Sequence, residues 1–100
     1  MSNDSRTLLL FFSSASSGPS RRMESLLAHI ARKERHRLRV VQIDVDDRRD
    51  VADKLGVEAA PTLLLVRGKD VIARIEGRAS APRIEHMLEQ HLPETAAAAA

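Results

Sequence analysis

The residues with the greatest capacity for chemistry lie in one serine-rich segment, Ser13-Ser-Ala-Ser-Ser-Gly-Pro-Ser20. Small hydroxyl residues ahead of a proline are typical of a helix N-terminus, where side-chain oxygens accept hydrogen bonds from the first backbone N–H groups. The simpler interpretation is that these serines only cap a helix. The alternative is an anion or peptide site, in which N–H groups, hydroxyls and the positive end of the helix dipole face one loop, with Arg21 or Arg22 nearby.

The hydroxyl and imidazole side chains do not form a recognisable catalytic set. To act as a hydrolytic nucleophile, Ser17 would need a base within hydrogen-bond reach. His29 is the only histidine on the same predicted helix, and it lies about 18 Å further along the helix axis. His36, His86 and His91 show no spacing typical of a base or a metal site. The sequence has no cysteine, which excludes disulfides, thiolate metal sites and thiol exchange, so we expect no enzyme activity, metal or cofactor.

Two clusters of charged residues have structural explanations that compete with binding sites. The basic cluster lies where a predicted helix ends and a strand begins, and comprises Arg32, Lys33, Arg35, His36, Arg37 and Arg39. Cations there complement a helix C-terminus, and the chain has only two aromatic residues, so we expect a solvated basic end rather than a nucleic-acid surface. The acidic residues lack the loop pattern of a calcium site, and helix capping explains most of them: Asp44, Asp46, Asp47 and Asp50.

The hydrophobic segments are too short to cross a membrane. The longest apolar runs, Leu8–Phe12 and Leu63–Val66, fall far below the ~20 residues that a spanning helix needs. The first residues, Met1–Arg6, carry an acidic residue where a secretory signal has basic ones. We therefore expect a cytoplasmic protein without a membrane partner.

Hydrophobic periodicity predicts four strands and three helices in a single domain over residues 7–92 of the 100-residue chain. Ser80 is placed to cap the last helix, and Asp46 or Asp47 to cap a short one that ends at Gly56. We expect residues 1–6 to be a flexible N-terminus and residues 93–100 a disordered, alanine-rich tail. The predicted elements are strand 7–12, a helix from Pro19, strand 38–45, a short helix with the apolar residues Val51, Ala52 and Leu55, strand 62–66, a two-residue turn at 68–69, strand 71–75, and a helix between Ser80 and Pro93.

With these elements in place, the chain resembles the thioredoxin family. Ser17-Gly18-Pro19-Ser20 follows a buried strand and opens a helix, where the family has Cys-Gly-Pro-Cys. Ala60-Pro61-Thr62 precedes an apolar strand, where the family has a cis-proline, and Gly77 matches the glycine after the hairpin. The resemblance covers about residues 7–92 and lacks only the family's first strand and helix. It implies a minimal α/β fold, β-α-β-α-β-β-α, with a mixed four-stranded sheet of order 2-1-3-4 and helices on both faces.

The departures from the family pattern fall on its redox residues. Ser17 and Ser20 replace both cysteines, Ser16 replaces the tryptophan before them, and Phe11 stands where the family has a buried acid. Alcohols form no reversible S–S bond, so the resemblance implies a redox-inactive member. The serines are either native to such a branch or an engineered Cys-to-Ser replacement.

The resemblance also implies a binding role. In the family, the backbone just before the proline pairs with an extended substrate, so the resemblance implies that Ala59 and Ala60 offer an N–H and C=O pair to a partner strand. Ala60 and Pro61, together with Ser16 to Ser20, are expected to bind a protein or an extended peptide. This would be an adaptor or chaperone-like function. The alternative is a small-anion site at the helix N-terminus, with Arg21 and Arg22 contacting a phosphate or carboxylate. The sequence does not indicate an oligomeric state.

Overall fold

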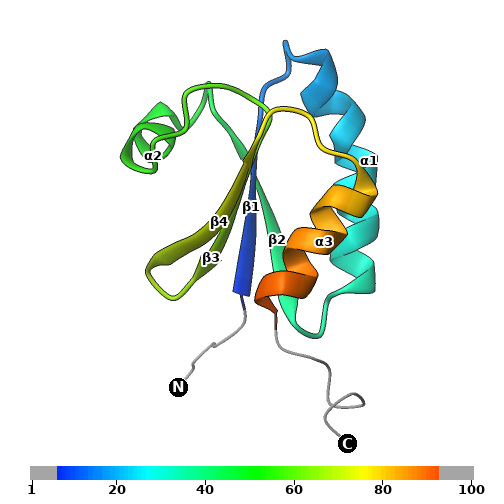
Figure 1. Cartoon of the computed structure of the whole chain (residues 1–100). Helices are drawn as coiled ribbons and strands as arrows, with labels where there is room; N and C mark the ends of the chain where they lie inside the picture. The colour runs from blue at the N-terminus through cyan, green and yellow to red at the C-terminus, as the bar shows by residue number, and fades with distance from the viewer. Residues whose placement is uncertain (1–6, 93–100) are drawn as a thin grey trace, which may run out of the picture.

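Four strands form one mixed sheet in the computed structural model, which describes residues 7–92 (Figure 1). The sequence order is β1 (Thr7–Ser13), α1 (Gly18–Lys33), β2 (Leu38–Asp44), α2 (Arg49–Lys54), β3 (Thr62–Arg67), β4 (Asp70–Glu76) and α3 (Ala81–His91). The order, type and number of these elements agree with the prediction; strand ends differ by a single residue, and α2 begins later than a cap at Asp46 or Asp47 would place it. The predicted N-terminal segment 1–6, the tail 93–100 and Pro93 lie outside the described residues.

The sheet has the order β2-β1-β3-β4, as expected for this fold. β1 and β2 run parallel because α1 returns the chain to the end of the sheet at which β1 begins. β3 is antiparallel to β1 and continues through a tight turn into β4, which is antiparallel to β3. Gly68 in that turn has a φ of 62°, the left-handed conformation that glycine adopts without steric cost. The two most apolar runs of the sequence therefore form the two central strands, β1 and β3, which are flanked on both edges.

The helices cover the two faces of the sheet unequally. α1 and α3 lie together on one face, and the short α2 lies on the other (Figure 1). Ser17 caps α1 by accepting a hydrogen bond from the Ser20 N–H, and Ser80 caps α3 by accepting one from the Arg83 N–H. No helix within residues 7–92 has the length and apolar character required to span a bilayer.

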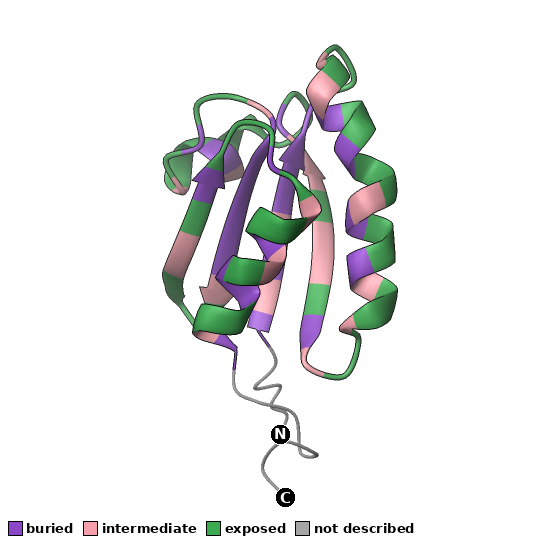
Figure 2. Ribbon diagram, turned by 45° about the vertical axis from the view of Figure 1, so that its right-hand side comes forward, coloured by how far each residue is buried: buried purple, intermediate pink, exposed green. Residues whose placement is uncertain are grey.

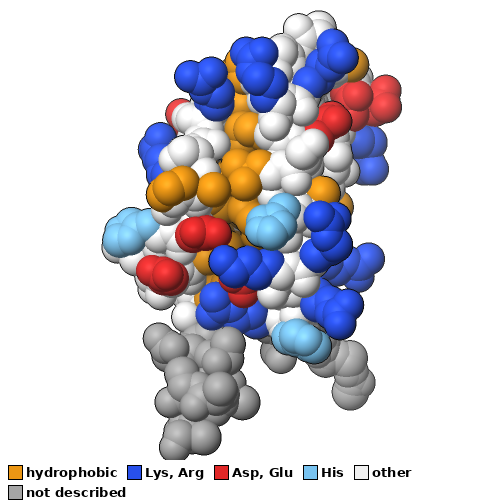
Figure 3. Space-filling view, turned by 90° about the vertical axis from the view of Figure 1, so that its right-hand side faces the viewer, with side chains coloured by type: hydrophobic (Ala, Val, Ile, Leu, Met, Phe, Trp, Pro, Cys, Tyr) orange, Lys and Arg blue, Asp and Glu red, His pale blue; other side chains and the backbone are white. Residues whose placement is uncertain are grey.

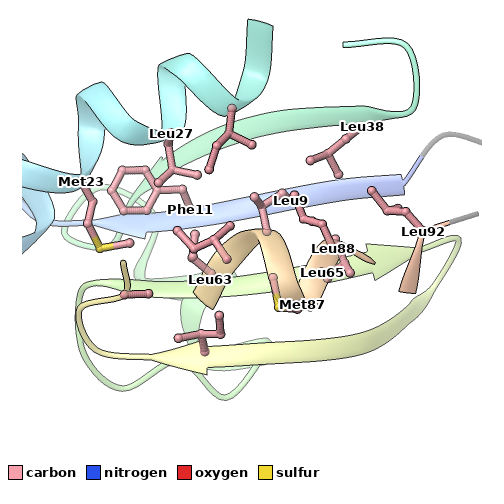
Figure 4. Close-up of a cluster of buried hydrophobic side chains, with 14 residues drawn as sticks. Leu9, Phe11, Met23, Leu27, Leu38, Leu63, Leu65, Met87, Leu88 and Leu92 are labelled. Carbon is pink, nitrogen blue, oxygen red and sulfur yellow. The ribbon is translucent and has the colours of Figure 1, made fainter. Parts of the chain in front are cut away.

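An apolar core lies on each side of the sheet, and the central strands are largely buried (Figure 2). The larger core lies between the sheet and α1 and α3, where side chains such as Leu9, Leu63 and Leu88 meet (Figure 4). The smaller core lies under α2 and includes Phe12 and Leu64. Alternate residues of β1 and β3 point to opposite cores, which explains why these strands read as continuous apolar runs.

The prediction that Asp46 or Asp47 caps α2 is wrong. The N-cap is Arg48, which makes no side-chain capping bond. The Asp44 carboxylate instead accepts hydrogen bonds from the backbone N–H groups of Asp46 (2.8 Å) and Asp47 (3.3 Å), forming a turn before the helix begins. The Asp46 carboxylate makes no capping bond to the backbone of α2; it accepts the Ser14 hydroxyl at 3.0 Å and pairs with the Arg49 side chain at 3.7 Å.

Candidate functional site

The serine segment and the proline segment lie at the same end of the sheet. β1 and β3 are antiparallel neighbours whose register pairs Phe12 with Thr62. The chain after β1 and the chain before β3 must therefore leave the sheet side by side, next to the end of β4. Residues more than forty positions apart in sequence, Ser13 and Pro61, become neighbours through this register alone.

The loop after β1 is held by hydrogen bonds of its own hydroxyl groups. The buried Ser14 Oγ lies 2.9 Å from the Ser16 Oγ and donates to Asp46 Oδ2 at 3.0 Å. The Ser16 N–H donates to the Ser14 Oγ (3.3 Å), and the Ser17 N–H donates to the Ser14 C=O (3.0 Å). Ser16 and Gly18 remain exposed and Ser17 half-buried, so a fixed loop presents these residues to solvent.

The first turn of α1 has few free hydrogen-bond donors. Ser20 N–H donates to the Ser17 Oγ (3.2 Å), Arg21 N–H donates to the Ser17 C=O (3.1 Å), and Pro19 has no N–H. Gly18 supplies the remaining N–H of this turn. The Arg22 guanidinium lies over that glycine, since a Cβ built on Gly18 would be 3.6 Å from its Nη1 and Nη2. Gly18, Arg21, Arg22 and Glu24 line a shallow depression here.

Two residues that depart from the family pattern, Ser20 and Phe11, are buried beneath this loop. Ser20 is 0% exposed, and its hydroxyl has no hydrogen-bond partner among the described residues. Phe11 is 1% exposed and packs beside Met23 and Leu27 (Figure 4). The interior is therefore apolar at Phe11, the position where the resemblance implies a buried acid in redox-active members.

The proline segment presents an unpaired piece of backbone beside this loop. The Ala60–Pro61 peptide bond is cis. Pro61 is buried and its C=O accepts the Gly77 N–H at 2.8 Å, while the Ala59 C=O accepts the Thr62 hydroxyl at 2.7 Å. Ala60, which lies between them, makes no backbone hydrogen bond to any other residue in the 7–92 range. Its N–H and C=O are the groups that an added extended strand would pair with.

The other candidate clusters lie elsewhere. The basic cluster lies at the C-terminal end of α1. At the helical rise per residue, this end is about 24 Å from the loop of residues 14–18, called here the Ser17 loop. Part of the cluster is paired within the protein, Arg37 with Glu34 at 2.7 Å and Lys33 with Glu85 at 3.3 Å. His29 is exposed on α1 and takes part in no contact with Ser17. Across the described part of the chain, no group of three or more His, Asp or Glu side chains is arranged to hold a metal ion.

Sequence reasoning missed three residues of the site. Ser14 and Asp46, separated by 32 positions, are joined by a hydrogen bond that ties the serine loop to the β2–α2 connection. Arg78 is exposed and follows Gly77, the residue bonded to Pro61. No local pattern signals these contacts, because each depends on which strands lie side by side.

Comparisons with known proteins agree with this architecture. A family model described as Thioredoxin matches residues 1–90. The chain is 30% identical over 91 residues to thioredoxin H-type from Fagopyrum esculentum, covering 91% of this chain and 77% of that protein. It is 28% identical over 75 residues to thioredoxin from Bacillus subtilis, covering 75% and 72% respectively. The crystal structure of thioredoxin NaTrxh from Nicotiana alata superimposes with a TM-score of 0.82 at 29% identity, covering 89% of this chain and 76% of that chain.

Proposed function

Because the chain belongs to the thioredoxin family but contains no cysteine, we propose that it binds extended segments of other proteins and carries out no thiol–disulfide exchange. The bound segment would lie between the Ser16–Ser20 loop and Ala60, in an adaptor or chaperone-like role. The cytoplasmic location expected from the sequence stays a prediction.

One observation carries this proposal, the unpaired backbone of Ala60 beside an exposed and internally braced loop. Ala60 is half-buried, and leaving its N–H and C=O without hydrogen bonds costs free energy unless water or a ligand bonds them. An extended peptide can bond both groups at once. The bracing favours binding further, since Ser14 and Ser17 already hold the loop in one conformation and little entropy is lost on association.

A peptide titration followed by amide chemical shifts tests the proposal. With a library of extended peptides, we expect shifts at Ser16, Gly18, Ala60 and Thr62, and none at Gly68, which lies at the other end of the sheet. Shifts confined to other surfaces, or none with any peptide, would reject the site.

Two tryptophan substitutions, one at the proposed site and one away from it, test where the peptide binds. Ala59 is exposed next to the unpaired backbone, so Ala59→Trp should block the bound segment and weaken peptide binding by about tenfold or more. Ala28→Trp adds the same ring at an exposed position midway along α1 and should leave binding unchanged. Equal loss in both variants would argue against the site.

The alternative of a small-anion site rests on the Arg22 guanidinium over Gly18. The first turn offers an anion a single unbonded N–H, and Glu24 lines the same depression, which together favour the peptide proposal. A phosphate-dependent rise in melting temperature that Arg21→Ala/Arg22→Ala abolishes would support the anion site instead.

A further inference from the structure

Three arginines without ion-pair partners lie on the segments that form the site, two at the start of α1 and one beside the residue bonded to Pro61. Arg21 and Arg22 are exposed near the start of α1, and Arg78 is exposed next to Gly77, whose N–H is bonded to the Pro61 C=O. None of the three side chains forms an ion pair or hydrogen bond with another residue in the described range. Figure 3 shows several Lys and Arg side chains across the upper end of the α1–α3 face, which is the end that carries the loop, with fewer Asp and Glu side chains beside them.

The acidic residues nearest to this end are largely engaged elsewhere. Asp46 accepts the Ser14 hydroxyl at 3.0 Å and pairs with Arg49 at 3.7 Å, and Asp44 is bonded by two backbone N–H groups. Glu24 accepts a hydrogen bond from the Gln42 side chain at 3.2 Å, and because it lines the depression beside Arg21 and Arg22 it offsets part of their charge. Glu76, at the end of β4, pairs with Arg74 at 3.2 Å. The other exposed acids near this end belong to α2 and the segments around it: Asp47, Asp50, Asp53 and Glu58. The site is therefore asymmetric, because on the side of α1 and α3 the three arginines outnumber the one nearby acid, Glu24.

We propose that the segment bound at the Ser17–Ala60 surface is an extended acidic peptide, whose Asp and Glu side chains face Arg21, Arg22 and Arg78. The inference rests on the peptide-binding function proposed above and specifies its partner. Side chains on one side of an extended peptide recur at every second residue, so alternate carboxylates would reach arginines along the α1 and α3 side while the peptide backbone pairs with Ala60. Arginine suits this role because its planar fork bonds a carboxylate through two N–H groups.

A nucleic acid is the other polyanion that arginines attract, and the same surface is poorly suited to it. Binding of single strands depends on aromatic side chains for base stacking. The two aromatic residues of the chain, Phe11 and Phe12, are 1% and 0% exposed, so neither can stack on a base.

The test compares fluorescently labelled peptides of equal length whose alternate residues are Glu, Gln or Lys, by anisotropy at low and high salt. Each exposed ion pair contributes a few-fold in affinity, so we expect the Glu peptide to bind about tenfold more tightly than the Gln peptide at low salt. We expect that advantage to shrink at high salt, where exposed charges are screened. Arg21→Glu/Arg22→Glu and Arg78→Glu should each remove most of it.

The control variant is Arg39→Glu/Lys69→Glu, which changes the net charge as much as the α1 pair. Both residues are exposed and lie at the other end of the sheet, opposite Leu8 and in the β3–β4 turn. This variant should keep the preference for the Glu peptide. Equal affinity for the Glu and Gln peptides, equal loss in the control, or tighter binding of a single-stranded oligonucleotide would overturn the acidic partner while peptide binding stands. Failure of all three peptides would overturn both proposals.

Discussion

Ser20 offers the sharpest test of how the interior beneath the loop is built. The residue is 0% exposed, its hydroxyl bonds to no described residue, and it lies in the first turn of α1. A buried hydroxyl without a partner loses its bonds to water and costs about 1–3 kcal/mol. Replacement by alanine removes this cost and adds up to about 0.5 kcal/mol of helix propensity. It also removes only one oxygen atom, so the cavity penalty is small at about 24 cal/mol per Å³.

We therefore expect Ser20→Ala to raise the free energy of unfolding by about 1–2 kcal/mol. Urea unfolding followed by circular dichroism measures this change, and the denaturant slope should stay the same because the buried surface hardly alters. For a domain of this size, the melting temperature should rise by roughly 4–8 °C per kcal/mol.

Ser25→Ala is the matched control for Ser20→Ala. Ser25 is exposed on the same helix, so this substitution reports helix propensity without the burial term. The difference between the two variants isolates the cost of the buried hydroxyl. A Ser20→Ala variant no more stable than Ser25→Ala, or less stable than the unsubstituted protein, would refute the reasoning by revealing a hydrogen bond at Ser20.

Further predictions concern the same region. Ser17→Ala removes the side-chain cap of α1 and should lower the free energy of unfolding by about 1 kcal/mol, measured by urea unfolding, with loss of helical signal if the first turn frays. Phe11→Ala should cost about 3–5 kcal/mol in the same assay, because it empties a fully buried ring position; a cost below that of Ser17→Ala would contradict the packing described. Gly77 has a φ of 86°, so Gly77→Ala should cost about 1–2 kcal/mol through backbone strain alone, and a neutral result would exclude this conformation. Ser17→Cys/Ser20→Cys places two thiols one helical turn apart, and thiol titration should show their loss on mild oxidation, whereas thiols that stay free would show that the turn no longer suits the family's chemistry.

Much of the fold could be predicted from the sequence because its signals are local. The capping serines act on N–H groups three residues away, as seen for Ser17 with Ser20 and for Ser80 with Arg83. Gly56, with a φ of 71°, ends the α2 segment in the left-handed conformation expected of it. The prediction that Asp46 or Asp47 caps α2 was also local, and it failed because the Asp44 turn occupies these residues, so the helix begins only at Arg49 and its N-cap is Arg48.

The candidate site was predictable only in part. Its members in the serine loop and before Pro61 follow from the family pattern, which already implies that the two segments are close. The structure adds partners that no spacing encodes: the Ser14–Asp46 hydrogen bond, and Arg78 beside the Gly77–Pro61 bond. These contacts come from the ends of different strands, so they depend on the order of the sheet rather than on any one segment.

The amino-acid sequence by itself determined the elements, the caps of α1 and α3, the β3–β4 turn and the absence of thiol chemistry, because each follows from residue type and from neighbours within a few positions. Only the tertiary structure decided which groups end without a partner. The buried Ser20 hydroxyl, the unpaired backbone of Ala60 and the uncompensated charge of Arg78 are all defined by what lies around them in space. Hydrogen bonding and charge pairing are satisfied or left open by packing, and packing is a property of the whole chain.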